Sequence, residues 1–191
     1  RSRLTTPEDP SVAMLAGLAA FGEAAPDYQR RTARLAHATT LVANTVIERK
    51  GACTALLATA GFRDVLELRR YVRVTTYELF SDPPPPLVPR RLRVPVTERV
   101  RADGSVQTAL DEAQFDAIAA HLREQGVESV AVCFLHSFTN PEHERAAGRL
   151  LAARLPGVAV SLSADVLPQI KEFERSSTTV VNAYVKPLRS E

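Results

Sequence analysis

The chain has 191 residues, of which 45% are hydrophobic and 24% are charged, a composition typical of a globular protein rather than a disordered one. The formal net charge is only +2 and the two signs are intermixed, so the one-sided basic surface of a nucleic-acid-binding protein is not expected. No apolar run approaches the roughly 20 residues of a membrane-spanning helix, which argues against a membrane protein.

The two cysteines, Cys53 and Cys133, lie in apolar stretches, as small buried hydrophobic residues do in a reducing compartment. We therefore expect free thiols and a cytoplasmic protein. The N-terminal stretch RSRLTTPEDP lacks the apolar segment of a secretion signal. Because the chain begins with Arg1 and its only methionine is Met14, we expect it to be a processed or excised part of a longer protein.

The first predicted element is a helix at residues 6–21, TPEDPSVAMLAGLAAF, with Asp9 as its N-cap. A short strand is predicted at 33–38, ARLAHA. Residues 39–51, TTLVANTVIERKG, have a threonine at the start and basic residues near the end, which predicts a helix that stops at Gly51.

A continuous apolar run of strand length follows at 53–59, CTALLAT, and predicts a strand covered on both faces. A helix is predicted next at 61–72, GFRDVLELRRYV. The four consecutive prolines within 81–90 cannot join a strand ladder or a helix interior, so this segment is predicted to be an extended, exposed connector.

Residues 91–110 read as two strands around a turn that contains Asp103 and Gly104, which predicts an antiparallel hairpin. Between 88 and 101, arginine alternates with valine and proline, a pattern that indicates arginines on the solvent face of a strand. The rest of the chain alternates regularly between helices and strands, predicted in the order helix 111–127, strand 128–137, helix 140–157, strand 158–165 and helix 167–187.

Such alternation predicts βαβ units, and therefore an α/β fold with a mixed, mainly parallel sheet and flanking helices. In sheets of this kind, ligands bind beyond the carboxyl ends of the strands. The turn His37-Ala38-Thr39-Thr40 is expected at such an end, where free amides and hydroxyls at a helix start suit a phosphate or carboxylate, and Asn44 lies one turn further on. The simpler alternative, which spacing alone favours, is a threonine N-cap with Asn44 tolerated in the helix.

Arg63 and Asp64 form a second candidate site, since they follow a predicted buried strand and arginine can bind a carboxylate or phosphate through two hydrogen bonds. The alternative is that Asp64 complements a helix dipole and Arg63 is an ordinary surface charge. His136 and His143 lie near acidic residues, but their spacing matches no familiar set of metal ligands, so no metal site is predicted. The chain also contains no Walker A, G-x-G-x-x-G or G-x-S-x-G motif.

Five stretches, in this order, cover nearly the whole chain: LTTPEDP, HATTLVANTVIERKGA, GFRDVLE, VAVCFLHSFTNPEHE and SLSADVLPQIKEFERSSTTVVNAYVKP. Together they resemble the N-terminal domain of the hydantoinase A and 5-oxoprolinase family, whose relatives include N-methylhydantoinases and the acetone and acetophenone carboxylase subunits. The resemblance implies an actin-like (ribonuclease H-like) ATPase lobe spanning residues 1–191.

The resemblance further implies ATP-dependent opening of a cyclic amide or imide such as hydantoin, N-methylhydantoin or 5-oxoproline, with ATP and Mg²⁺ as cofactors. The implied partners are a second lobe of the same chain and a hydantoinase B-type subunit, so the isolated fragment would be inactive. Two alternatives stay open, a subunit of an ATP-dependent ketone carboxylase and a non-catalytic assembly domain. Under the enzymatic interpretation, the residues nearest the substrate or phosphate would be His37, Thr39, Thr40, Asn44, Arg63 and Asp64.

The sequence departs from the family pattern in three places. The family's Asp-x-Gly-Gly-Thr phosphate-binding hairpin would lie upstream of Arg1. The family's His-Gly-Thr-Thr has Ala38 in place of glycine here, and its methyl group would hinder close approach to the backbone amides. After GFRDVLE, the family often has Gly-Arg-Gln where this chain has Arg69-Arg70-Tyr71, which leaves the substrate open.

Overall fold

The computed structural model describes residues 10–24, 27–34, 40–71, 77 and 84–187. The chain divides into two units, Arg1–Thr40 and Leu41–Glu191. The first unit contains the helices α1 (Pro10–Ala24) and α2 (Tyr28–Arg31), and the ring of Phe21 meets that of Tyr28 edge-on with centroids 5.2 Å apart. The predicted strand at 33–38 lies mostly outside the described residues.

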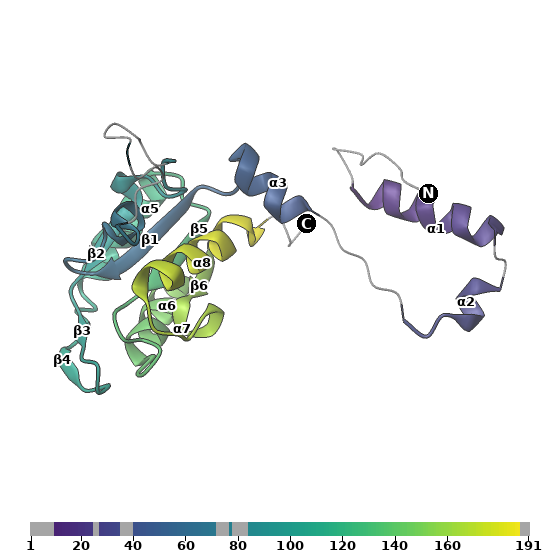
Figure 1. Cartoon of the computed structure of the whole chain (residues 1–191). Coiled ribbons are helices and arrows are strands. Elements are labelled where there is room, and N and C mark those ends of the chain that lie inside the picture. The colour runs from purple at the N-terminus through teal and green to yellow at the C-terminus, as the bar shows by residue number, and fades with distance from the viewer. Residues whose placement is uncertain (1–9, 25–26, 35–39, 72–76, 78–83, 188–191) are drawn as a thin grey trace. The chain divides into compact units, whose positions relative to one another are not determined.

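The second unit is built on four parallel strands in the order β2-β1-β5-β6 (Figure 1). Both central strands, β1 (Thr54–Thr59) and β5 (Ser129–Cys133), are buried at every position. Their continuous runs of alanine, leucine and valine suit a sheet that is covered on both faces. The edge strands are β2 (Arg93–Val96) and β6 (Ala159–Leu162).

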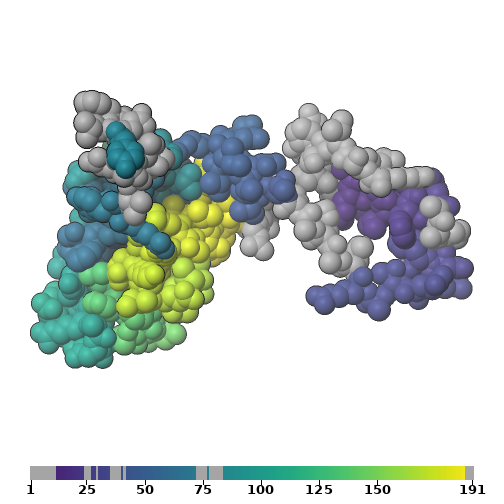
Figure 2. Space-filling model, in the orientation of Figure 1, coloured from purple at the N-terminus to yellow at the C-terminus, as the bar shows by residue number. Residues whose placement is uncertain are grey.

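The long helices of the second unit close the core around this sheet. α8 (Glu172–Val185) packs against β1, β5 and β6, while α6 (Glu142–Arg154) packs against β5, β6 and α5 (Gln114–Glu124). In the space-filling view, α8 (yellow) forms part of the surface beside α3, Leu41–Glu48 (Figure 2). The α/β class with a mainly parallel sheet is therefore confirmed. Among the described residues, no helix is both long and apolar enough to cross a membrane.

The segment 91–110 differs from the prediction of two strands in one hairpin. β2 pairs in parallel with β1, with Leu56 opposite Arg93, whereas the antiparallel hairpin is formed by β3 (Arg99–Val100) and β4 (Val106–Thr108). The turn at Gly104 is where the sequence placed it, with a left-handed φ of 84°. The segment thus contributes to two sheets, the second of which is a separate two-stranded hairpin.

Several helices are shorter than predicted because residues in the left-handed region end them. α4 covers only Val65–Leu68, since Arg69 has a φ of 54°. α8 begins at Glu172 because Lys171 has a φ of 88°, and the residues before it include a short helix, α7 (Ser163–Val166), that the sequence did not predict. A 3₁₀ turn, η1 (Arg90–Leu92), precedes β2.

Gly51 does not end α3 as predicted. The left-handed residue is Arg49, with a φ of 55°, and the amide of Lys50 donates to the carbonyl of Thr45 at 3.1 Å. Gly51 is needed for a different reason: a Cβ there would lie 2.1 Å from Cε1 of Tyr184. The carbonyl of Tyr184 accepts a hydrogen bond from Ala52 at 3.0 Å, so the two segments are held together at this point.

We predict that Gly51→Ala lowers the free energy of unfolding by about 1–3 kcal/mol, because the added methyl group must displace a ring in a packed contact. Urea denaturation of the variant and the wild type measures this difference. Gly148→Ala is the matched control: its Cβ would meet only the flexible tip of Leu162, at 3.3 Å, and alanine favours the α6 helix. A Gly51→Ala variant as stable as this control would contradict the prediction.

Candidate functional site

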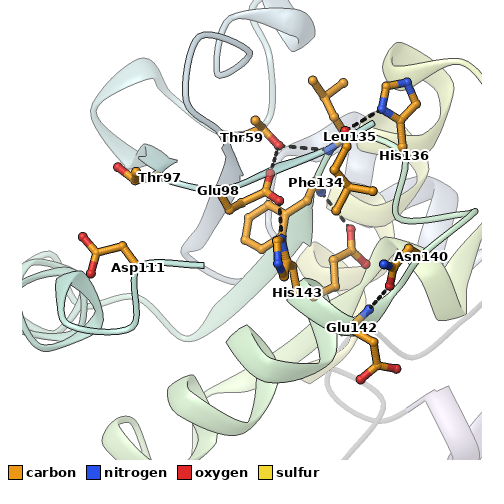
Figure 3. Close-up of polar contacts among 12 residues, drawn as sticks. Thr59, Thr97, Glu98, Asp111, Phe134, Leu135, His136, Asn140, Glu142 and His143 are labelled. Atoms are coloured by element: carbon orange, nitrogen blue, oxygen red, sulfur yellow. Dashed lines mark hydrogen bonds and ion pairs between the residues drawn. The ribbon is translucent and has the colours of Figure 1, made fainter. Parts of the chain in front are cut away.

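The carboxyl ends of β1, β2 and β5 meet at one edge of the sheet because the strands are parallel. The residues at or just beyond these ends are Thr59, Glu98, Phe134 and Leu135, and α6 begins nearby with Glu142 and His143 (Figure 3). This edge is where ligands bind in open parallel sheets.

Glu98 is a buried carboxylate at this edge, with no side-chain exposure. The amide of Leu135 donates to the hydroxyl oxygen of Thr59 at 2.9 Å, and the Thr59 hydroxyl in turn donates to Oε1 of Glu98. A hydroxyl has a single proton, so the Leu135 amide leaves that proton free for Glu98. Glu98 is therefore oriented as a hydrogen-bond acceptor.

His143 lies against the other oxygen of this carboxylate, with 2.7 Å between Nδ1 and Oε2 of Glu98. A carboxylate is an acceptor, so Nδ1 carries a proton, and in the neutral form of the ring the lone pair is then on Nε2. Among the described residues, the hydrogen bond to Glu98 is the one that the His143 ring makes, and 12% of the side chain is exposed. The arrangement can accept a proton at Nε2.

The neighbouring Glu144 fixes the start of α6. Its buried carboxylate accepts hydrogen bonds from the amides of Phe134 and Ala164, both at 2.8 Å, and from the hydroxyl of Ser163 at 2.6 Å. Burial raises the pKa of Glu144, and these donors oppose that shift by stabilising the charged form. The donors come from the carboxyl end of β5 and from α7, so these two elements hold the first turn of α6 in place. His143, which is in the same turn, is held with it.

Arg175 extends this network from α8. It is fully buried, donates to the carbonyl of Phe134 at 2.6 Å and to the hydroxyl of Ser137, and lies 5.5 Å from the ring centroid of Phe138. Ser137 is 3.1 Å from Ser163, which links Arg175 to Glu144 through two hydroxyls. Among the described residues, Nε of Arg175 is the buried side-chain polar atom without a partner.

The predicted pair Arg63 and Asp64 lies beyond the end of β1, in an arginine cluster. Arg90 binds Asp64 through two hydrogen bonds of 3.1 Å each, which hold the pKa of that carboxyl below its ordinary value. Arg93 approaches Asp64 at 3.5 Å and Glu67 at 2.7 Å. Arg93 is buried, so the expectation that the arginines of 88–101 face solvent is wrong for this residue.

A hollow of about 430 Å³ adjoins this cluster. Four of its lining residues are arginines, of which Arg90 and Arg93 are already paired with acidic side chains, so the lining is basic overall. The lining residues are Arg63, Arg90, Arg91, Arg93, Val94, Pro95 and His121.

Of the other predicted site residues, the structure describes two. His37 and Thr39 lie outside the described residues. Thr40 and Asn44 are described and exposed, Thr40 directly before α3 and Asn44 within it. Among the described residues, no group of three or more histidine, cysteine or acidic side chains is placed to hold a metal ion.

Sequence reasoning missed Glu98 and Arg175. For Glu98 a signal was present, since a glutamate two residues beyond an apolar strand end is placed at the ligand-binding edge. His143 was considered only as a metal ligand, because its partner lies 45 residues away in sequence.

Comparisons with a family model, with curated relatives and with solved structures all indicate the same protein family. The family model "Hydantoinase/oxoprolinase N-terminal region" matches residues 2–155. The caprolactamase alpha subunit of Pseudomonas jessenii is 39% identical over 96% of this chain and 27% of that subunit. An uncharacterized protein of Methanocaldococcus jannaschii is also 39% identical, over 97% of this chain and 27% of its own length. The chain thus spans about 27% of the length of these relatives.

Two solved structures share the fold over nearly the whole chain. The crystal structure of the ATP-dependent caprolactamase from Pseudomonas jessenii superposes with a TM-score of 0.86 at 38% identity, covering 97% of this chain and 28% of that one. The nucleotide-free structure of acetone carboxylase gives a TM-score of 0.79 at 25% identity, covering 98% and 29%. The resemblance predicted from the sequence is therefore confirmed.

We predict that Asp64→Asn lowers the free energy of unfolding at pH 7 by up to about 1 kcal/mol, a small effect because 36% of this side chain is exposed. The folded-state pKa of Asp64 is lowered, so its contribution is present above the unfolded value of 3.8 and is lost as the pH falls through the folded value. Urea denaturation of wild type and variant between pH 7 and pH 2 should therefore show a difference that vanishes at the acid end.

Asp116→Asn serves as the control for this experiment, since Asp116 also pairs with an arginine, Arg154 at 2.6 Å, but is 78% exposed. It should change stability by no more than a few tenths of a kcal/mol. An Asp64→Asn difference that persists unchanged at pH 2 would contradict the proposed ion pair.

Proposed function

We propose that this chain, which belongs to the hydantoinase/oxoprolinase N-terminal family, is part of an ATP-dependent enzyme that opens a cyclic amide or imide. The observation that carries the proposal is the likeness to an ATP-dependent caprolactamase through nearly the whole chain. The substrate class is a small ring containing an amide bond, such as hydantoin, N-methylhydantoin, 5-oxoproline or a lactam.

The chemistry explains why such an enzyme uses ATP. An amide carbonyl is a poor electrophile, and transfer of a phosphoryl group from ATP to its oxygen converts that oxygen into a leaving group. Catalysis then depends on positioning and on stabilising the charge of the transferring phosphoryl group, for which Mg²⁺ is the ordinary partner. An actin-like ATPase lobe, completed by a second lobe of the same chain, would supply the nucleotide site.

Two sets of residues in this chain would contribute to binding. Arg63 and the other guanidinium groups of the arginine-lined hollow have the charge to hold a phosphate or carboxylate, with Asp64 orienting Arg90. The second proposed set is His37, Thr39 and Thr40, whose residue types offer hydrogen-bond donors, together with Asn44 in α3. Several relatives are named as alpha, beta or gamma subunits, so we also propose a partner subunit of the hydantoinase B type. Both cysteines are free thiols, which favours a cytoplasmic location.

A ketone carboxylase is the second candidate function, because the fold is also that of acetone carboxylase. Bicarbonate is a substrate of such a reaction and not of ring hydrolysis, so the dependence of ATP consumption on bicarbonate separates the two. A non-catalytic assembly domain is the third, and Ala38 favours it. If Ala38→Gly in the full-length protein leaves the affinity for ATP unchanged, this third alternative loses its support.

We predict that the full-length protein, purified with its partner subunit, releases phosphate from ATP only when a ring substrate is added. Hydantoin, N-methylhydantoin, 5-oxoproline and caprolactam are tested separately, with phosphate release measured by colorimetry and the ring-opened product by mass spectrometry. Omitting bicarbonate should change neither. Residues 1–191 alone should show no turnover, since the second lobe is missing.

A ketone-dependent and bicarbonate-dependent ATPase with no ring-opened product would contradict the hydrolase and support the carboxylase. Sustained turnover by the isolated 191 residues would contradict the need for a second lobe.

A further inference from the structure

We propose that Nε2 of His143 is the general base that takes a proton from the water molecule attacking the phosphorylated ring, and that Glu98 and Thr59 are its positioning residues. This role rests on the function proposed above and assigns one step of it to a residue of this chain. It concerns the step after phosphoryl transfer, for which ATP itself provides no proton acceptor.

The two ring nitrogens of His143 differ in their surroundings. Nδ1 is held at 2.7 Å by Glu98, whereas Nε2 makes no hydrogen bond to the described residues, and 12% of the side chain is exposed. Here one nitrogen is fixed and the other is free to accept a proton.

A buried carboxylate, Glu98, lies behind the His143 ring. Glu98 has no exposed side-chain surface, so its negative charge acts on the imidazole with little screening by water. It therefore stabilises the positive charge that the ring gains when Nε2 takes up a proton, as a carboxylate does behind other catalytic histidines. Thr59 donates to the remaining oxygen of Glu98 and is itself oriented by the Leu135 amide, so the carboxylate is held from both sides.

His143 is also held in a fixed position at the ligand-binding edge of the sheet. His143 stands in the first turn of α6, which Glu144 ties to Phe134 and Ala164. The ring thus lies at the carboxyl edge of the parallel sheet, beside the ends of β1 and β5, where substrates bind in this class of fold (Figure 3). A base must be held in a fixed geometry to be effective, and this network provides it.

In the phosphorylated ring, the carbon bears the O-phosphate and a C=N bond to the ring nitrogen, which lost its N–H proton on phosphoryl transfer. The water oxygen bonds to this carbon, one water O–H bond breaks with its proton going to Nε2 of His143, and the π electron pair of the C=N bond moves to the ring nitrogen, which takes that proton from the imidazolium. The new hydroxyl then gives its proton to the nitrogen as its O–H electron pair forms a C=O bond and the C–N bond breaks, which leaves an amine and an acyl phosphate. A second water hydrolyses the acyl phosphate and releases inorganic phosphate.

The test uses the full-length protein with its partner subunit, ATP, and whichever of the four rings the wild type opens. A rapid-quench first turnover measures ADP and ring-opened product separately. In His143→Gln we expect the first-turnover ADP to keep the wild-type amplitude, because phosphoryl transfer precedes the water step. The rate of ring-opened product should fall about 10²–10⁴-fold, with an unchanged KM for ATP.

Two further variants separate catalysis from structure. His136→Gln is the matched control, since His136 lies at the same edge but its Nδ1 contacts the carbonyl of Val100 at 2.9 Å rather than a carboxylate. It should change the product rate less than about threefold, well below the 10²-fold minimum expected of a lost base. In His143→Ala, added imidazole should restore part of the product rate, an outcome that a packing role would not produce.

The base role is overturned if His143→Gln forms product at the wild-type rate. It is also overturned if this variant loses both ADP formation and product formation in the first turnover. Absence of imidazole rescue together with a lowered Tm in His143→Ala also overturns it, in favour of a structural role. A wild type that opens none of the rings contradicts the proposed function itself, and the base role with it.

Discussion

The structure depends on burying two carboxylates at the carboxyl edge of a parallel sheet. Beyond β5 the amides of Phe134 and Leu135 have no strand to pair with, and unpaired buried amides are costly. Glu144 takes the first amide, and the hydroxyl of Thr59 takes the second and passes its own proton to Glu98. The hydrogen bonds from these donors offset the cost of burying each carboxylate, and the same acceptors offset the cost of burying each amide.

The same constraint decides where the helices begin. Glu144 is on the first turn of α6. Its Oε1 also accepts from the hydroxyl of Ser163 and its Oε2 accepts from the amide of Ala164, and these two donors form the start of α7. Arg175 connects α8 to the same place through Ser137 and the carbonyl of Phe134. Three helices and the ends of two strands therefore share one polar centre, so the positions of side chains at this edge are set by the fold as a whole rather than by a local loop.

The sequence predicts the elements that periodicity and composition define. The central strands β1 and β5 are apolar throughout, and α5, α6 and α8 have clear helical spacing, so the α/β class followed from local patterns. β2 was merged with the hairpin because its pattern contains Arg93 and Pro95, residues that are unusual in a buried parallel strand. Only its tertiary partners explain it: Arg93 is neutralised by Glu67 and Asp64 from α4 and the turn before it.

The candidate site likewise contains residues that local sequence patterns indicate and contacts that only the tertiary structure shows. Arg63 and Asp64 could be proposed from the sequence because they closely follow a strand, and their role in binding stays a prediction. The pairing of Glu98 with His143 could not be predicted from the sequence. The two residues are 45 positions apart, and neither one indicates by its type or position that it contacts the other. The predicted turn at His37 and Thr39 lies outside the described residues and stays a proposal.

The short edge strand β2 joins the two charged regions of the molecule. At its start, Arg93 is a buried cation held by acids from α4 and its preceding turn, and two residues beyond its end Glu98 is a buried anion held by Thr59 and His143. A slip of one residue in the pairing with β1 would turn every side chain of β2 to the opposite face and separate both charges from their partners. Buried charges without partners cost several kcal/mol each, so the ion pairs of Arg93 and the hydrogen bonds to Glu98 fix the register of a strand that is short, at the sheet edge and interrupted by Pro95. The arginine-lined hollow and the Glu98–His143 pair are thus positioned by one strand, and a fold that forms one of them correctly forms the other.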